Sequence, residues 1–540
     1  MTQKNILFIM CDQLRWDYLS CYGHPHLHTP NIDKLAERGV RFDRAYVQSP
    51  ICAPSRASYY TGRYMSSHGV SVNFAALRPD ELGIGDYLAP LGVRTALVGK
   101  THSFPDLEGM KRLGIDPKSK LGEHLDNIGF EPYLRDDGLH PEDKRAENVE
   151  YNRYLRSKGY EGVNPWQTHA NGALDEEGKW VNGWFLNAGT LPADIDDKHA
   201  ETPYTTRRAI DFIEEAGDQP WCVHLSYIKP HWPYIAPEPY ASMYGVDDFL
   251  PINRSEGELD DAHPVFKAYT QSQPSRGFQN MDARLAVLQA YMGLIKQIDD
   301  NVGEMMAFLK ARGQLDNTVV VFTSDHGDYL GDHWMGEKSF FHEEAVRVPM
   351  IIADPSPEAD VTRGTVDTRF VEAIDLLPTF IELSGGEIPA HRLEGRSLLP
   401  LLYGQEVDWR TYAVSEVDFA DRGSRFILGL PDDRCNSVMI RTERWKYVGF
   451  DSFRPILFDL ENDPQETNDL GSHPDYATIR AEMQTHLVQW LMRRKTRITL
   501  TDNNIQSLVH GWNREKRGIL IGFPDVEDLP EFLRDQYRSQ

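Results

Sequence analysis

Four stretches of this chain, far apart in the sequence, share one pattern: an apolar run that ends on side chains able to bind metals or move protons. The stretches are Asn5–Cys11 before Asp12, Val93–Val98 before Lys100, Trp221–Tyr227 before His231, and Thr318–Thr323 before Asp325 and His326. Apolar runs of this length are typical of strands buried on both faces, as in parallel sheets. The pattern therefore predicts a parallel sheet whose strands end on polar groups.

A strongly periodic segment lies between the third and fourth of these runs. Its apolar residues are spaced by threes and fours, the pattern of one helix face: Leu285, Leu288, Met292, Ile295, Ile298, Val302, Met305 and Leu309. Asp282 is predicted to cap the start of this helix, and Gly313 its end. Strands that alternate with helices favour an α/β fold with a large, mostly parallel sheet. Because ligands of such sheets bind outside the carboxyl ends of the strands, we expect the four polar ends to line one crevice.

The pattern of the chain divides its 540 residues into three parts. Residues 1–408 are predicted to form a catalytic α/β domain, with a long insertion over about 106–200 that is rich in Gly, Asn, Asp and Glu. Residues 409–500 hold short strand-like runs and a helical segment from about Tyr476 to Met492, which predict a smaller C-terminal α+β subdomain. Residues 501–540 are expected to be a tail used for assembly.

The net charge and the spacing of the cysteines limit the binding partners and the location that are expected for this chain. Lys and Arg number 57 and Asp and Glu 82, so the formal charge is 57 − 82 = −25. A chain this acidic binds polyanions poorly, so neither nucleic acid nor a membrane is expected as a partner. The five cysteines are Cys11, Cys21, Cys52, Cys222 and Cys435. Their wide spacing predicts no disulfide framework, and without a signal-peptide pattern a cytoplasmic location is expected.

The most specific local signal is Cys52-Ala53-Pro54-Ser55-Arg56, followed by Thr61-Gly62-Arg63. Pro54 suits the first turn of a short helix, and Gly62 suits its end. Cys52 would then lie at a helix N-terminus, where the dipole favours anions, with Arg56 one turn further on the same face. The residues alone leave two other readings open, a buried structural cysteine and a plain thiolate nucleophile.

This motif resembles the signature of the type I sulfatases, members of the alkaline phosphatase superfamily. The resemblance implies an alkaline-phosphatase-like fold, a large mixed sheet flanked by helices. It also implies that a formylglycine-generating or equivalent maturation enzyme converts Cys52 to formylglycine, an aldehyde whose hydrated form supplies the nucleophile. Asp12, Asp325 and His326, with an oxygen on modified Cys52, resemble the ligands of the one divalent metal ion in that family.

Two positions are more similar to the phosphonate monoester hydrolases, a bacterial branch of the same superfamily. Many sulfatases carry a second acidic residue where this chain has Gln13, and an asparagine where it has His326. Sites with those residues suit Ca²⁺, which remains an alternative for this chain. An imidazole ligand such as that of His326 instead favours Mn²⁺ or another transition metal. Asn73 resembles an asparagine that contacts the substrate in phosphonate hydrolases and choline sulfatases, and Gln13 is expected to contact the substrate as well.

The anion pocket is similar instead to that of the sulfatases. Lys100 and His102 match the sulfatase pattern Gly-Lys-x-His, where phosphonate monoester hydrolases carry Tyr and Thr. Lys100, Lys338 and Arg56 are expected to surround the substrate anion and neutralise its charge. The resemblance implies that His231, assisted by Lys338, protonates or shields the leaving oxygen. It implies that His102 takes the proton that allows sulfate to be expelled.

The leading prediction is a hydrolase of aryl or small alkyl sulfate esters. The alternative is a phosphonate monoester or phosphodiester hydrolase with the same nucleophile, and promiscuity between these small-molecule esters is expected. A third reading, from a different class, is a metal-binding protein without turnover in which Cys52 stays a thiol. The family's habits favour a homo-oligomer, a dimer or a tetramer.

For several further residues the sequence leaves both a functional and a structural interpretation open. Trp166, Trp180 and Trp184 of the insertion either line an apolar leaving-group pocket or serve the structure. His224 is predicted to be a core histidine, whereas His68 and His333 lie near the motifs without a role that the sequence assigns.

Overall fold

The large sheet that the four apolar runs predict is present in the computed structural model of the chain, which describes residues 3–142, 146–511 and 519–538. Its strand order is β10-β2-β9-β8-β1-β7-β3-β4. The strands are β1 Asn5–Asp12, β2 Val40–Tyr46, β3 Arg94–Gly99, β4 Glu131–Arg135, β7 Trp221–Pro230, β8 Thr318–Ser324, β9 Met350–Ala353 and β10 Thr365–Glu372. Among the described strands of this sheet, β9 alone runs antiparallel to its neighbours, so the sheet is mixed but mostly parallel.

Helices cover both faces of the sheet because successive side chains of its buried central strand point to opposite sides. Leu7 and Ile9 of β1 pack in one core with α1 Pro30–Glu37, α9 Glu201–Ala216 and α12 Met281–Ala311. Ile6 and Phe8 pack in a second core with α2 Cys52–Thr61 and α14 Leu376–Leu383. The result is a three-layer arrangement in which β1 is buried along its whole length.

The long helix α12 confirms the periodic pattern, with two corrections. Its N-cap is Asn280, whose side chain accepts a hydrogen bond from the Ala283 amide at 3.1 Å, and not the predicted Asp282. The helix begins two residues earlier than the capping prediction requires, so Asp282 lies inside its exposed first turn. Leu285 is half-buried, whereas the other seven apolar residues of the pattern are buried.

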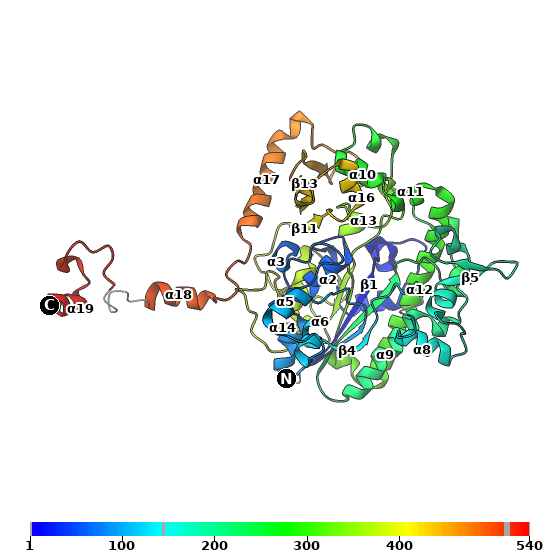
Figure 1. Cartoon of the computed structure of the whole chain (residues 1–540), viewed down its shortest axis with the longest axis horizontal. Helices are drawn as coiled ribbons and strands as arrows, with labels where there is room; N and C mark the ends of the chain where they lie inside the picture. Colours follow the sequence, from blue (N-terminus) through cyan, green and yellow to red (C-terminus); the bar gives the residue numbers. More distant parts are fainter. Residues whose placement is uncertain (1–2, 143–145, 512–518, 539–540) are drawn as a thin grey trace.

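A smaller antiparallel sheet follows in the last third of the chain. Its strands are β11 Ala413–Asp418, β12 Asn436–Arg441, β13 Trp445–Phe450 and β14 Ile456–Asp459, in that order. The helix α17 Ala477–Met492 packs on this sheet through Met483 and Trp490. In Figure 1, α18 Asp502–Gly511 and α19 Glu531–Arg538 (both red) extend away from the body of the molecule.

The segment predicted as an insertion contributes to the main sheet as well as to the surface. It supplies the edge strand β4, which pairs in parallel with β3, and a short hairpin of β5 Gly172–Leu174 and β6 Trp180–Asn182. The remaining α-helices are α3 Met65–His68, α4 Ile84–Leu88, α5 Leu107–Leu113, α6 Lys120–Asp126, α8 Glu150–Ser157, α10 Pro264–Thr270, α11 Gln273–Gln279, α13 Glu343–Val346, α15 Leu399–Leu402 and α16 Gly423–Leu428.

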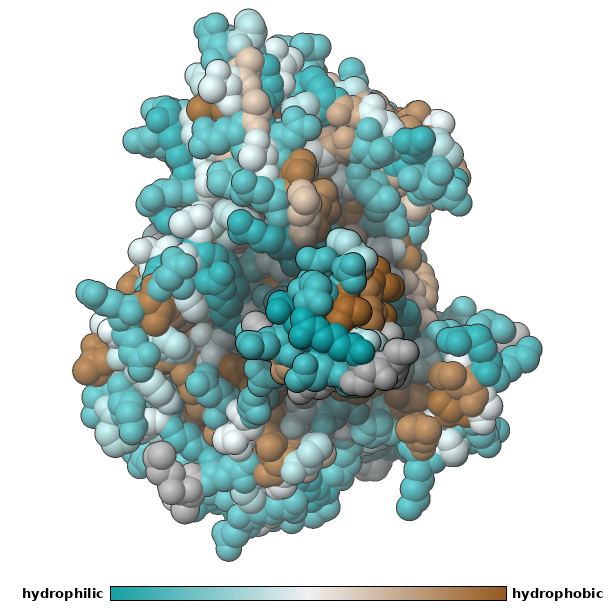
Figure 2. Space-filling model, turned by 90° about the vertical axis from the view of Figure 1, so that its left-hand side faces the viewer, coloured by the Kyte–Doolittle hydropathy of each residue, from teal (hydrophilic) through white to brown (hydrophobic). Residues whose placement is uncertain are grey.

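The surface agrees with the acidic composition. The face shown in Figure 2 is mainly hydrophilic, and its hydrophobic patches are small and separate. Among the described helices, none combines the length and the apolar composition that crossing a membrane requires.

Candidate active site

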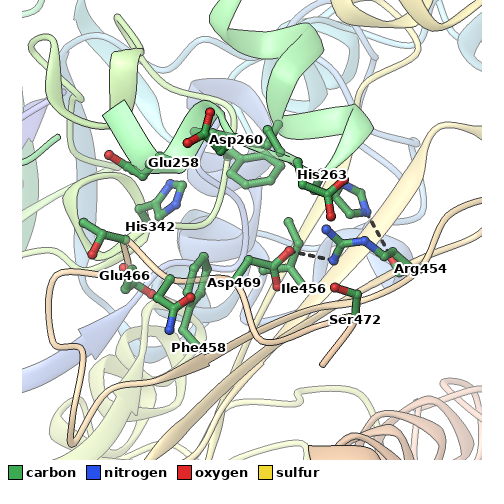
Figure 3. Close-up of a pocket in the computed structure, with 17 residues that line it drawn as sticks. Glu258, Asp260, His263, His342, Arg454, Ile456, Phe458, Glu466, Asp469 and Ser472 are labelled. Atoms are coloured by element: carbon green, nitrogen blue, oxygen red, sulfur yellow. Dashed lines mark hydrogen bonds and ion pairs between the residues drawn. The ribbon is translucent and has the colours of Figure 1, made fainter. Parts of the chain in front are cut away.

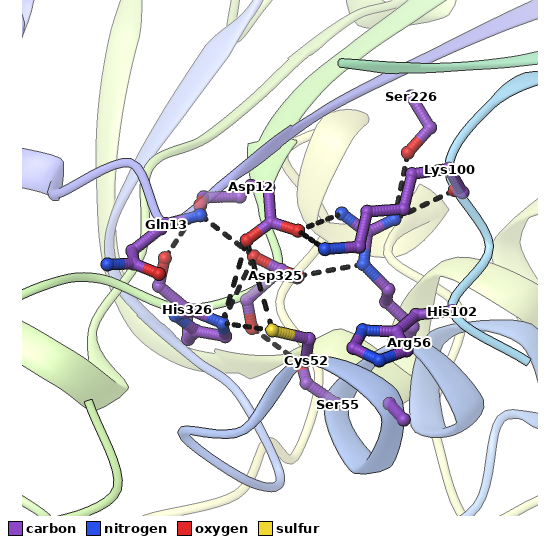
Figure 4. Close-up of polar contacts among 12 residues, drawn as sticks. Asp12, Gln13, Cys52, Ser55, Arg56, Lys100, His102, Ser226, Asp325 and His326 are labelled. Atoms are coloured by element: carbon purple, nitrogen blue, oxygen red, sulfur yellow. Dashed lines mark hydrogen bonds and ion pairs between the residues drawn. The ribbon is translucent and has the colours of Figure 1, made fainter. Parts of the chain in front are cut away.

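The polar groups that follow the predicted strands meet at one edge of the sheet, as expected. Asp12 ends β1, Asp325 and His326 follow β8, and Lys100 follows β3 (Figure 4). Because β1, β3, β7 and β8 run parallel, their carboxyl ends lie together, and the helix α2 delivers Cys52 to the same place.

The helix α2 places Cys52 in its first turn. Pro54 follows inside that turn, and Gly62 ends the helix in the left-handed conformation with a φ of 65°. Two side chains hold the start of the helix in position. Asn73 accepts a hydrogen bond from the Ala53 amide at 3.1 Å, and Ser55 donates one to the carbonyl of Asp325 at 2.6 Å. The predicted substrate contact Asn73 thus lies beside the site, with its side-chain oxygen occupied by the helix.

Four buried side chains form a group suited to a metal ion: Asp12, Cys52, Asp325 and His326, whose ligand atoms all lie within 4.8 Å of one another. The Nε2 atom of His326 lies 3.8 Å from Asp12 Oδ1 and 3.7 Å from Asp325 Oδ1. Its Nδ1 atom lies 2.8 Å from the carbonyl of Gly327, which can only accept, so the lone pair is on Nε2 and faces the carboxylates. Two carboxylates and one imidazole fit a divalent cation such as Mn²⁺.

Arg56 lies behind the carboxylates and does not face open space. Its guanidinium is fully buried and donates to Asp325 Oδ2 at 2.8 Å and to Asp12 Oδ2 at 3.2 Å. Its remaining donors go to the Ser226 hydroxyl at 2.8 Å and to the Lys100 carbonyl at 2.9 Å. The expectation that Arg56 helps to surround the substrate anion stays a prediction, and the structure shows its side chain orienting the two carboxylates.

Lys100 supplies a second positive charge to the same carboxylate. Its Nζ atom lies 2.5 Å from Asp12 Oδ2, and the side chain is 1% exposed. Burial and the neighbouring Cys52 would raise the pKa of Asp12, but Lys100, His231 and Arg56 hold it below its ordinary value. Asp12 therefore stays ionised although it is fully buried.

The surroundings of Cys52 favour negative charge. Lys338 Nζ lies 2.9 Å and His326 Nε2 lies 3.1 Å from its sulfur atom. Burial would raise the pKa of the Cys52 thiol, yet Lys338, Lys100 and His326 lower it well below its ordinary value. The pocket therefore stabilises a negative charge on the side chain at position 52, whether the charged atom is sulfur or oxygen.

Gln13 lies in a hydrogen-bond chain that runs away from the site. Its Oε1 accepts from Lys338 Nζ at 2.9 Å, and its Nε2 donates to Tyr234 at 3.0 Å and to Asp328 at 2.5 Å. Tyr234 also donates to Asp328, and burial raises the pKa of that carboxyl. Both ends of the Gln13 amide are thus engaged by the protein, and Gln13 positions Lys338.

The two predicted acid–base histidines flank this centre. His231 Nε2 lies 4.0 Å from Asp12 Oδ1, while its Nδ1 contacts the carbonyl of Trp232 at 2.8 Å. Burial, together with Lys338, lowers the pKa of His231 to about 3. His102 is held by a backbone hydrogen bond to Asp137 at 2.7 Å with a φ of 54°, and it contributes to lowering the pKa of Cys52.

Four residues of the site were missed by sequence reasoning: Ser226, Tyr234, Asp328 and Asp137. Local signals existed for two of them, because Asp328 is two residues after His326 and Tyr234 is three residues after His231. Ser226 lies inside a predicted apolar strand, and Asp137 lies in the predicted insertion. Nothing in the local pattern marks either of these as a partner of the site.

The three histidines to which the sequence assigned no catalytic role, His68, His224 and His333, contact residues outside the candidate active site. His224 stacks on Phe8 with ring centroids 4.4 Å apart and is hydrogen-bonded to Tyr60, which confirms it as a core residue. His68 is bonded to Ser58 at 3.0 Å. His333 lies 2.6 Å from Glu258 in a buried ionic cluster, and its ring stacks on His342.

This ionic cluster borders a second cavity, of about 140 Å³, between the small sheet and the body (Figure 3). Glu258, His342, Arg454, Glu466 and Asp469 line it. Burial lowers the pKa of His333, but Glu344 and Glu258 raise it to about 10, so this imidazole is a charged partner of carboxylates. The cluster has the character of a structural ion-pair network.

Comparisons with known proteins agree with this geometry. The family model described as Sulfatase matches residues 4–386, and the model described as N-sulphoglucosamine sulphohydrolase, C-terminal, matches residues 331–493. The chain is 32% identical to the multifunctional alkaline phosphatase superfamily protein PehA of Trinickia caryophylli, over 93% of this chain and 97% of that protein. It is 29% identical to an arylsulfatase of Clostridium perfringens, over 88% and 91%.

Solved structures give the same picture. The phosphonate monoester hydrolase of Silicibacter pomeroyi superposes with a TM-score of 0.80 at 28% identity, covering 92% of this chain and 97% of that one. The phosphonate monoester hydrolase of Agrobacterium radiobacter superposes with a TM-score of 0.79 at 29% identity, covering 91% and 96%.

Proposed function

Because this chain belongs to the sulfatase family of the alkaline phosphatase superfamily, we propose that it hydrolyses sulfate monoesters, with a formylglycine derived from Cys52 as the nucleophilic residue. Hydrolase activity follows from the family, and the proposal adds the substrate and the nucleophile. The observation that carries it is the cationic pocket around position 52, where Lys338 lies 2.9 Å from the side chain and Lys100 pairs with Asp12.

The residues of the chain divide the work between them. Lys100 and His102 would bind the oxygens of the transferred group on one side of position 52. Lys338, directed by Gln13, would donate a hydrogen bond to the departing alcohol oxygen, with His231 beside it. Arg56 donates to both carboxylates and would hold them in the orientation that a cation requires.

Two absent groups would complete the site. Asp12, Asp325 and His326 would hold a divalent metal ion, for which we propose Mn²⁺, and the ion would neutralise charge and lower the pKa of an oxygen nucleophile. The formyl group at position 52, in its hydrated form, would supply that oxygen. A thiol at position 52 in fully matured protein would instead support the reading of a metal-binding protein without turnover.

A second candidate is hydrolysis of phosphonate monoesters or phosphodiesters. Gln13 and His326 favour it, and so does the likeness to two phosphonate monoester hydrolases along most of the chain. Sulfate and phosphonate monoesters both carry one negative charge. They differ because a carbon substituent of the phosphonate replaces an oxygen that Lys100 or His102 could bind.

The test is the ratio of kcat/KM for an aryl sulfate and an aryl phosphonate monoester that share one leaving group. Both are measured on one manganese-loaded preparation in which the mass of the Cys52 peptide shows formylglycine. We expect a large preference for the sulfate. A large preference for the phosphonate would support the second candidate function. It would also mean that the sulfatase-like pattern of Lys100 and His102 does not determine the substrate.

A further inference from the structure

A cavity of about 360 Å³ with aromatic walls lies beside the candidate active site. Two aromatic pairs form much of its wall: Trp184 with Trp232, whose ring centroids are 5.4 Å apart, and Tyr234 with Phe278, at 6.0 Å. The other residues around it are Gly183, Leu186, Pro233, Gln273, Pro274, Gly277 and Glu337. The volume is in the range of small-molecule pockets, about 300–1,000 Å³.

Residues of the cavity wall are next to residues of the candidate active site. The ring of Trp232 contacts the ring of His231 in a tilted arrangement, with centroids 4.1 Å apart. Tyr234 accepts a hydrogen bond from Gln13, whose other end binds Lys338. Glu337 directly precedes Lys338 in the chain. Residues of the cavity wall thus adjoin Lys338 and His231, the two groups expected to face a leaving group.

Trp184 reaches this place from the segment over 106–200. Its indole nitrogen donates to Gln167 at 2.7 Å, which holds the ring against Trp232. Of the three tryptophans for which two readings stayed open, Trp166 is buried and bonded to Glu201, and Trp180 is 42% exposed. Trp184 is thus the one of the three that faces this cavity.

One charged side chain, Glu337, occurs among the described residues that line the cavity. Within the described part of the chain, its half-buried carboxylate has no hydrogen-bond donor and no cation at ion-pair distance. Burial raises its pKa, as does Asp328, while Lys338 and Arg422 lower it. Its backbone has a φ of 60°, a conformation that non-glycine residues rarely adopt and that recurs at functional sites.

We propose that this cavity binds the alcohol part of the ester and selects alcohols that carry an ammonium group. Aromatic faces attract cations through their quadrupoles, and an unpaired carboxylate at an apolar wall supplies the counter-charge. The inference rests on the proposed function only in taking the ligand to be an ester. Because the cavity would contact the departing alcohol, the same preference for ammonium-bearing alcohols is expected for sulfate and phosphonate esters.

The experiment compares two esters of equal shape, 3-(trimethylammonio)phenyl sulfate and 3-tert-butylphenyl sulfate. Their intrinsic reactivities differ, so the measured quantity is the ratio of kcat/KM between wild type and Glu337→Gln for each ester. We expect Glu337→Gln to reduce kcat/KM about tenfold for the cationic ester and less than twofold for the neutral one. An equal effect on both esters would overturn the proposal.

Two further variants guard against a structural explanation. Glu256→Gln makes the same charge change at an exposed position and should alter neither ratio. Trp184→Leu should weaken the cationic ester selectively, as Glu337→Gln does, because it removes an aromatic face. If Trp184→Leu affected both esters alike, the wall would serve only packing.

A binding measurement separates this proposal from the proposed function. Titration calorimetry with the free phenols, 3-(trimethylammonio)phenol and 3-tert-butylphenol, requires no turnover. Tighter binding of the cationic phenol, lost in Glu337→Gln, would support the cavity even if neither sulfate ester were hydrolysed. Equal affinity for the two phenols, with active enzyme, would contradict the cavity and leave the proposed function intact.

Discussion

At the scale of single residues, position 52 is defined by the charges placed around it. The cysteine sulfur has a lysine ammonium at 2.9 Å and an imidazole nitrogen at 3.1 Å, all buried. Because buried charges are weakly screened, they act strongly on any anion that forms there. These contacts support the proposal that position 52 carries the nucleophile.

We expect Cys52→Ser to reduce multiple turnover at least 100-fold, because an ester formed on an unmodified serine would need a separate hydrolysis step. The measurement is steady-state turnover of an aryl sulfate, with intact-protein mass spectrometry to detect a trapped adduct. Cys21→Ser, outside the site, is the matched control and should retain activity. Full turnover by Cys52→Ser would rule out the proposed nucleophile.

Lys100 is expected to discriminate between the two ester classes. Its ammonium can bind a sulfate oxygen but gains nothing from the carbon substituent of a phosphonate. Lys100→Met should therefore lower kcat/KM about 10–100-fold more for an aryl sulfate than for the matching phosphonate, as an oxyanion donor is worth roughly that factor or more. A uniform loss on both esters would mean that Lys100 acts mainly through its pair with Asp12.

At the scale of elements, β11 carries a buried carboxyl group that the fold must accommodate. Glu416 lies on this strand, is 3% exposed and accepts a hydrogen bond from the Ser66 amide at 3.2 Å. Burial raises its pKa from an ordinary value of 4.5 to about 7. The folded state therefore binds this proton more tightly than the unfolded state does.

The sign of the resulting pH dependence is set by that raised pKa. The stabilising contribution of protonated Glu416 is present at low pH and is lost as pH rises from about 4.5 to about 7. We expect Glu416→Gln to raise the free energy of unfolding by about 1–3 kcal/mol at pH 8 and to change it little at pH 4. Urea denaturation at both pH values, with the exposed Glu482→Gln as control, measures this. Destabilisation at pH 8 would contradict it.

At the scale of the whole molecule, an ionic cluster connects the small sheet to the active-site loop. Lys446 of β13 is fully buried and contacts Glu343 at 2.8 Å and Glu466 at 2.5 Å. It also donates to the carbonyl of Phe341, three residues after Lys338. The docking of the C-terminal sheet thus supports the segment that positions Lys338.

Removing this lysine should destabilise the molecule strongly. Lys446→Met leaves the buried carboxylate of Glu466 without its cation, whereas Glu343 keeps Arg347 and Arg441 nearby, and breaking a buried pair in this way typically costs about 3–5 kcal/mol. We expect a lower thermal midpoint, earlier proteolysis near the small sheet, and reduced activity. Lys111→Met, on an exposed helix, should have no such effect. An unchanged thermal midpoint for Lys446→Met would show that the cluster does not hold the two parts together.

The elements that sequence reasoning predicted correctly depend on local pattern. The four apolar runs are strands, the periodic segment is a helix, and Gly62 ends the signature helix, because each depends on residues close to one another in the chain. Asp12, Cys52, Asp325 and His326 also converge as predicted, since the carboxyl ends of parallel strands must share one edge of the sheet. The errors are at places where neighbouring residues compete, as Asn280 and Asp282 do for the cap of α12.

The sequence by itself thus determined the fold class through periodicity and the family through the resemblance of its motifs, and it predicted the four side chains that could hold a metal ion. Only the tertiary structure decided which partners each of the site's side chains contacts. Arg56 faces the carboxylates, Gln13 is held by Tyr234 and Asp328, and the Glu337 carboxylate has no hydrogen-bond or ion-pair partner among the residues that the structure describes. These contacts join residues up to several hundred positions apart, and the packing of whole elements against one another decides them, which no local pattern encodes.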